Sequence, residues 1–144
     1  MPKISKKASS KRKDKWDVLI VEDDLATRAE LLRTLGSYAR CVTVDDGQKA
    51  LETYSLSAKN KKPFDFILLD VSIPSIGGFD LLKTIRSEEE SRSNQKGPII
   101  IMVTAYKDSL MENYNMGWDD YISKPIEPDK LIKRMQDLIS KRQP

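Results

Sequence analysis

The sequence predicts an α/β protein in which a parallel sheet is covered by helices on both faces. Short apolar runs alternate five times with segments of helical periodicity, and strict alternation favours crossover connections between parallel strands. The apolar runs contain few polar residues, which is typical of strands buried on both faces. Polar side chains that can react or bind ligands follow the ends of these runs. A single domain of this kind accounts for nearly the whole chain.

The predicted strands are the most apolar segments of the chain. FDFILLD and PIIIMVTA are nearly continuous apolar runs, and turn-forming residues such as those of IPSIGG mark the loops between elements. The predicted strands are residues 16–22, 40–44, 64–70, 98–105 and 119–123.

The predicted helices have apolar residues three and four positions apart. Their ranges are 25–38, 46–56, 79–90, 106–117 and 128–142. The residues expected to face the core are Leu25, Ala29, Leu32 and Leu35 in the first helix, and Leu131, Ile132, Met135, Leu138 and Ile139 in the last. Asp24 comes directly before the first helix, and we expect its side chain to cap that helix.

The composition is that of a soluble globular domain. Of 144 residues, 39% are hydrophobic and 33% are charged. The chain contains no apolar run near the roughly 18 residues that a membrane helix needs, and no apolar stretch follows its basic start as in a signal peptide. The single cysteine, Cys41, cannot form an internal disulfide. These features predict a cytoplasmic protein without membrane insertion.

Charge is distributed unevenly along the chain. Residues 1–15 carry seven Lys or Arg and one acid, whereas the remaining 129 residues carry 18 basic and 21 acidic side chains. We expect residues 1–15 to be a disordered basic tail and residues 16–142 to form the domain. The tail either contacts a nucleic acid or another anionic surface, or is a solvated leader. We expect no contact between the domain itself and nucleic acid.

Acidic, hydroxyl and lysine side chains follow the predicted strands. Glu22 and Asp23 follow the first strand, Asp70 ends the third, Thr104 lies in the fourth and Lys124 follows the fifth. In open α/β sheets, sites form outside the carboxyl ends of the strands. The sequence therefore places these five residues at one edge of the sheet.

This set of residues favours phosphoryl transfer. Several carboxylates at one edge repel one another unless a cation is shared, and oxygen ligands without His or Cys suit Mg²⁺. Lys124 and the hydroxyl of Thr104 can bind the oxygens of a phosphoryl group. Asp70 is the natural nucleophile, because it ends the most apolar strand.

Four segments in order and in spacing, VLIVEDD, LLDVSIPSIGG, IMVTA and DDYISKPI, resemble the receiver domains of two-component signalling. The resemblance covers residues 16–142. It implies a flavodoxin-like (βα)5 three-layer sandwich, with a five-stranded parallel sheet of order 2-1-3-4-5. It also predicts a cis peptide bond between Lys124 and Pro125, where the family often has one.

The resemblance also assigns roles to individual residues. It implies that Glu22 and Asp23 hold Mg²⁺ together with Asp70 and the main-chain carbonyl of Ser72. Asp70 would be the phosphoacceptor, and Thr104 and Lys124 would bind the phosphoryl oxygens. The aromatic side chain of Tyr121 would move with Thr104 during switching.

By this resemblance the chain is a phosphorelay switch and not a metabolic enzyme, although it would catalyse its own phosphorylation and dephosphorylation. It has no histidine, so the phosphohistidine must belong to a histidine kinase or a histidine phosphotransfer protein. A downstream protein would contact the surface formed by residues 106–142. The chain is either a free-standing, chemotaxis-type regulator, which Met1 favours, or the receiver of a larger regulator or hybrid histidine kinase.

Two other functions use some of the same residues. A degenerate receiver would act only as a binding module, but here all the site residues are present. An aspartate-based, Mg²⁺-dependent phosphatase of the haloacid-dehalogenase type needs an acid two positions beyond Asp70, where this chain has Ser72. The loop after Asp70 also departs from the receiver pattern, because Gly77 stands before Gly78 where Asp is usual. We expect this change to alter loop stability and not the chemistry.

Overall fold

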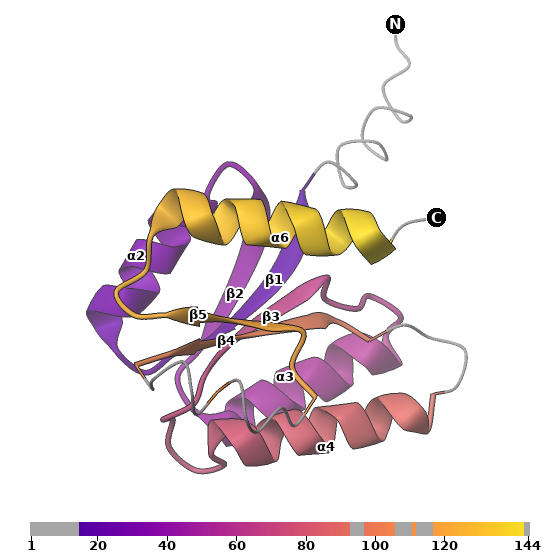
Figure 1. The fold of residues 1–144 in the computed structure, drawn as a ribbon. Helices are drawn as coiled ribbons and strands as arrows, with labels where there is room; N and C mark the ends of the chain where they lie inside the picture. The colour runs from indigo at the N-terminus through magenta and orange to yellow at the C-terminus, as the bar shows by residue number, and fades with distance from the viewer. Residues whose placement is uncertain (1–14, 93–96, 106–110, 112–116, 143–144) are drawn as a thin grey trace, which may run out of the picture.

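The computed structural model describes residues 15–92, 97–105, 111 and 117–142. Within these ranges the chain forms a five-stranded parallel sheet of order β2-β1-β3-β4-β5, as predicted. Figure 1 shows the sheet between two layers of helices. The expected disorder of the tail concerns residues that lie outside the described ranges, apart from Lys15. Of the predicted helix 106–117, only Met111 and Gly117 are described.

The observed elements follow the predicted order. The strands are β1 (Trp16–Val21), β2 (Ala39–Val44), β3 (Phe66–Asp70), β4 (Ile99–Thr104) and β5 (Asp120–Ser123). The helices are α2 (Leu25–Leu35), α3 (Gly47–Lys59), α4 (Gly78–Glu90) and α6 (Pro128–Arg142). The first helix is thus shorter than predicted, and α3 runs three residues further.

Alternate residues of the central strands enter two separate cores. Val18 and Ile20 of β1 pack on the face covered by α2 and α6, whereas Leu19 and Val21 pack on the face covered by α3 and α4. Every residue of β3 and β4 is buried. Burial on both faces explains why these strands are continuously apolar in the sequence.

The helix α6 buries the predicted stripe, whereas α2 buries only Leu35 of the four residues predicted to face the core. In α6, the buried residues are Leu131, Ile132 and Met135, with Leu138 and Ile139 packed against the same core. In α2, the core residues are Leu31 and Leu35, whereas the predicted Leu25, Ala29 and Leu32 are exposed.

The error in α2 has a simple cause. The spacings 25/29/32 and 31/35 are both compatible with a helix, and only the contact with the sheet decides which of them is buried. Leu25 is 72% exposed and Leu32 is 40% exposed, so the helix presents apolar side chains to its surroundings.

The helix α4 begins at two glycines that have different surroundings. Gly77 is the N-cap residue and makes no side-chain capping hydrogen bond, and an added Cβ would meet nothing within 4 Å. At Gly78, by contrast, an added Cβ would lie 2.5 Å from the main-chain oxygen of Asp70. Gly77 therefore leaves α4 without the side-chain cap that an Asp at this position could supply.

We expect Gly77→Ser to raise the free energy of unfolding by about 1 kcal/mol. The hydroxyl would restore a cap, and the unfolded chain would lose conformational freedom, at a position whose φ of −64° suits any residue. Urea unfolding measures the difference. Gly78→Ala is the contrasting variant and should be destabilised, because its Cβ meets main-chain atoms. If the free energy of unfolding rose in both variants or fell in both, the different roles assigned to Gly77 and Gly78 would be contradicted.

Candidate active site at the carboxyl edge of the sheet

Parallel pairing brings the predicted site residues to one edge. Val21 pairs with Leu69, and Asp70 pairs with Val103, so Glu22, Asp70 and Thr104 lie at level strand ends. Thr104 is the last residue of β4 and pairs with Ser123, directly before Lys124. The Lys124 main-chain N–H donates to the Thr104 carbonyl at 2.8 Å. The sequence prediction of a shared edge is therefore confirmed by the geometry.

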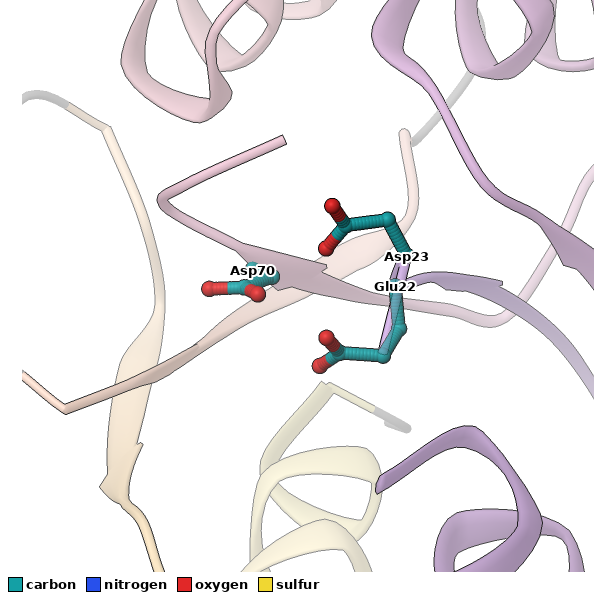
Figure 2. Close-up of side chains that lie close together, drawn as sticks. All are labelled: Glu22, Asp23 and Asp70. Atoms are coloured by element: carbon teal, nitrogen blue, oxygen red, sulfur yellow. The ribbon is translucent and has the colours of Figure 1, made fainter. Parts of the chain in front are cut away.

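Three carboxylates converge at this edge. Glu22, Asp23 and Asp70 each present an oxygen, and these oxygens lie within 4.8 Å of one another. Figure 2 shows Glu22 and Asp23 directed from the end of β1 toward the space beside Asp70. Glu22 is 1% exposed and Asp70 is 6% exposed, whereas Asp23 is open to solvent. Buried acids this close repel one another strongly.

Lys124 neutralises part of this charge. Its Nζ lies 3.1 Å from Asp70 Oδ2 and 3.2 Å from Glu22 Oε1, so one ammonium contacts both buried carboxylates. Burial works against the charged form, but the hydrogen bond and charge of Asp70, together with Glu22, outweigh it and raise the pKa of Lys124. The lysine therefore stays protonated and can receive an anionic group.

Glu22 is the carboxylate of the cluster whose charged form is most disfavoured by its surroundings. Burial, and then the neighbouring Asp70, raise the pKa of Glu22 to about 7, although the Asp24 N–H and Lys124 act in the opposite direction. The Asp24 N–H donates to Glu22 Oε2 at 3.2 Å. Glu22 Oε1 accepts no hydrogen bond among the described residues, and its contact with Lys124 Nζ is an ion pair.

An orphaned carboxylate oxygen beside two further carboxylates fits a hard cation. Buried polar atoms normally have partners, and a divalent ion would supply one to Glu22 while relieving the repulsion from Asp23 and Asp70. The donors are oxygens only, which suits Mg²⁺. The predicted contribution of the Ser72 carbonyl stays a prediction.

The remaining predicted residues lie on, next to or directly after the strands of the same sheet. The Ser72 N–H donates to Asp70 Oδ1 at 3.2 Å, which orients the carboxylate. Thr104 is fully buried, and Tyr121 is half-buried against the core on the α3 and α4 face. The Lys124–Pro125 bond is cis, as predicted. Asp24 caps α2 as predicted, because its Oδ2 accepts the Thr27 N–H at 2.8 Å.

Sequence reasoning missed one residue that supports the site. Arg28 Nη1 donates to the main-chain oxygen of Glu22 at 3.0 Å and so ties the first turns of α2 to the end of β1. No sequence motif marks this arginine, because the contact depends on how α2 leaves the sheet.

The fold and the site together define a flavodoxin-like α/β domain that can hold a cation and an anion at one edge. The sequence profile of the response regulator receiver domain matches residues 18–136. The chain therefore belongs to the receiver domain family of two-component response regulators. Members of this family act as signalling switches.

Among curated proteins, the chain is similar to the transcriptional regulatory protein CiaR of Streptococcus pneumoniae. The two are 31% identical over 127 residues, which cover 86% of this chain and 51% of CiaR. Protein MrkE of Klebsiella pneumoniae is 30% identical over 87% of this chain and 44% of its own length. The chain thus spans about half the length of these relatives.

Solved receiver structures show the same fold. The receiver domain of the sensor histidine kinase PA1611 from Pseudomonas aeruginosa, which has Mg²⁺ coordinated in its active-site cleft, is 26% identical with a TM-score of 0.71. This match covers 88% of this chain and 98% of that domain. A CheX–CheY–BeF3–Mg complex from Borrelia burgdorferi matches with 25% identity and a TM-score of 0.73, over 86% of this chain and 89% of that one.

The described part of the chain contains no helix that is both long and apolar enough to cross a membrane.

The raised pKa of Glu22 predicts a pH-dependent stability of the metal-free protein. Between the ordinary pKa of a glutamate and about 7, the folded state holds a proton that the unfolded state has released. Stability should therefore fall as pH rises, by at most about 2 kcal/mol between about pH 5.5 and about pH 7.5. Glu22→Gln lacks the titrating group and should lose less, so urea unfolding of both proteins with chelator at the two pH values measures the difference. Equal losses in the two proteins would contradict the assignment.

Proposed function

We propose that the chain is a phosphorylatable switch in which Asp70 accepts a phosphoryl group from a partner's phosphohistidine. One observation carries the proposal: the carboxylate of Asp70, 6% exposed, lies between the Lys124 ammonium at 3.1 Å and the acidic pair Glu22 and Asp23. A nucleophile with a cation and anionic metal ligands beside it is what phosphoryl transfer requires. The Mg²⁺ ion coordinated in the active-site cleft of the PA1611 receiver domain supports the proposal that this site also binds Mg²⁺.

In the proposed reaction an Asp70 oxygen attacks phosphorus in line with the phosphohistidine nitrogen. The P–N bond breaks, its electron pair stays with the imidazole, and an acyl phosphate forms. Lys124 would exchange its contact with the Asp70 carboxylate for one with a phosphoryl oxygen, and the Thr104 hydroxyl would donate to another. Glu22, Asp23, Asp70 and the Ser72 carbonyl would hold Mg²⁺, which neutralises the charge that develops on the equatorial oxygens.

The phosphoryl donor lies outside these 144 residues. The chain contains no histidine, so a histidine kinase or a histidine phosphotransfer protein would supply the phosphohistidine. The exposed Leu25 and Leu32 of α2 lie on the helix that starts beside Asp23 and offer an apolar surface on which such a partner can dock. The same site would hydrolyse the acyl phosphate slowly.

We further propose residues 16–142 as the receiver domain of a cytoplasmic regulator, preceded by the basic tail 1–15. The family match at 18–136 and the single, half-buried cysteine support this assignment. The chain would be either a free-standing regulator or the receiver of a longer protein, and the curated relatives are about twice as long as the match.

Acetyl phosphate with Mg²⁺ should add one acid-labile phosphoryl group to the chain, and intact mass spectrometry would detect it. Asp70→Asn should abolish the added mass, because the amide lacks the nucleophilic oxygen. Lys124→Gln should reduce the rate of labelling at least about tenfold, since one positive charge near the transferring group is removed. Full labelling of Asp70→Asn would place the acceptor elsewhere.

Phosphorylation should also change the surface around Tyr121. The new charge would draw the Thr104 hydroxyl toward Asp70. The side chain of Tyr121, which is half-buried on the adjacent strand β5, would then turn into the space that Thr104 vacates. This movement would alter the face of residues 106–142 on which a downstream protein docks, part of which lies outside the described residues.

Beryllofluoride, a stable phosphoryl mimic, provides the measurement. Backbone and aromatic chemical shifts should change at Thr104 and from Asp120 to Lys124, and Tyr121→Ala should respond at Thr104 without the wider change. If the shifts were confined to the Glu22 and Asp23 segment in the parent protein, this switch would be refuted.

A further inference from the structure

The loop that follows Asp70 carries Ser72, whose carbonyl the proposed function assigns to the metal site. It runs from Val71 to Gly77 and is tied at both ends: the Ser72 N–H donates to Asp70 Oδ1 at 3.2 Å, and the Gly78 N–H donates to the Val71 carbonyl at 3.0 Å. These bonds fix the ends of the loop but leave its middle to be held from outside.

The middle of the loop is held by the first residue of α3. The Gly47 N–H donates to the Pro74 carbonyl at 3.0 Å. The first N–H groups of a helix have no partner inside the helix, so Gly47 is able to bind the loop. The side chain of Asp46 accepts from the Lys49 N–H at 2.7 Å and caps a different donor. Cap and loop therefore use separate N–H groups.

The loop approaches Gly47 so closely that no side chain fits there. An added Cβ would lie 2.0 Å from the main-chain oxygen of Ile76 and 2.8 Å from its carbonyl carbon. Both are main-chain atoms, so a change of rotamer cannot relieve the overlap. Ile73 and Ile76 themselves pack against the core beneath the loop. A larger residue at position 47 must therefore displace the loop while its isoleucines hold it to the domain.

We propose that Gly47 is a positioning residue for the metal site: its small size and its N–H set the place of the 71–77 loop and thereby direct the Ser72 carbonyl toward the acidic cluster. This rests on the proposed function, which assigns that carbonyl to Mg²⁺. The residue touches neither metal nor phosphoryl group and acts through Pro74 and Ile76. It thus links the start of α3 to the acceptor strand β3.

Gly47→Ala tests the proposal, with Gly77→Ala as the matched control. Both changes add one methyl group and remove the same freedom from the unfolded chain, but an added Cβ at Gly77 meets nothing within 4 Å. In Gly47→Ala we expect the amide signals of Ser72 and Gly78 to shift in the metal-free protein. The Mg²⁺ concentration at half-saturation, followed by chemical shifts, should rise about tenfold, as for residues that orient metal ligands. The control should stay within about twofold of the parent.

A purely structural glycine would give another result. Gly47→Ala would then unfold at a lower temperature but bind Mg²⁺ with the half-saturation of the parent, and this outcome overturns the proposal. Labelling by acetyl phosphate separates it from the proposed function: we expect slower labelling at low Mg²⁺ and the parent rate at saturating Mg²⁺. An unlabelled parent protein would refute the phosphoacceptor role, whereas the metal titration would still decide the role of Gly47.

The parent protein offers a second measurement, which decides the question even if Gly47→Ala does not fold. Because coupling between two sites is reciprocal, Mg²⁺ should slow hydrogen exchange of the Gly47 amide together with that of Gly78. Protection of Gly78 without any change at Gly47 would show that the loop and α3 are independent, and would overturn the proposal.

Discussion

The rest of the structure depends on the repulsion between two buried carboxylates at the ends of β1 and β3. Glu22 and Asp70 are almost inaccessible to water and share one ammonium group, that of Lys124. A single positive charge does not balance them together with Asp23. Burial, and then the neighbouring Asp70, raise the pKa of Glu22, and one oxygen of this carboxylate accepts no hydrogen bond among the described residues. The metal-free site is therefore held in a state that a cation stabilises, because a divalent ion removes the repulsion and supplies the missing partner at the same time.

The sheet makes this unfavourable arrangement possible. Parallel strands end at one edge, so acids that are distant in the sequence are brought together by backbone pairing and need no favourable contact of their own. The cost is met by two apolar cores, one on each face, to which β3 and β4 contribute every residue. Unfavourable polar arrangements at functional sites are commonly offset by favourable packing elsewhere in the protein. The polar side chains lie at the strand ends, where the cores stop, and this is why Asp70 is buried and yet close to the surface.

This organisation explains which features could be predicted from the sequence. Helix alternation and the shared edge of Glu22, Asp70 and Lys124 follow from local patterns combined with the rules of parallel sheets. The order of the strands was implied only by the resemblance to receiver domains. The buried face of α2 could not be predicted, because Leu25 and Leu31 belong to two stripes of equal quality and only tertiary packing selects one. The contacts of Arg28 and Gly47 could not be predicted for the same reason: each joins the first turn of a helix to a strand end or a loop outside that helix, and no periodicity encodes such a contact.

The hydrogen bonds around β5 limit how a phosphoryl group can act on the surface. The Lys124 N–H is bound to the Thr104 carbonyl, and on the outer edge of β5 Arg134 of α6 bonds to the Asp120 carboxylate at 2.8 Å and to the Tyr121 carbonyl at 3.3 Å. Sliding β5 as a unit would break several of these bonds, each of which contributes on the order of 1 kcal/mol. Rotation of a half-buried side chain such as Tyr121 leaves all of them intact. The proposed switch is therefore cheapest as a rearrangement of the Thr104 and Tyr121 side chains on a fixed backbone.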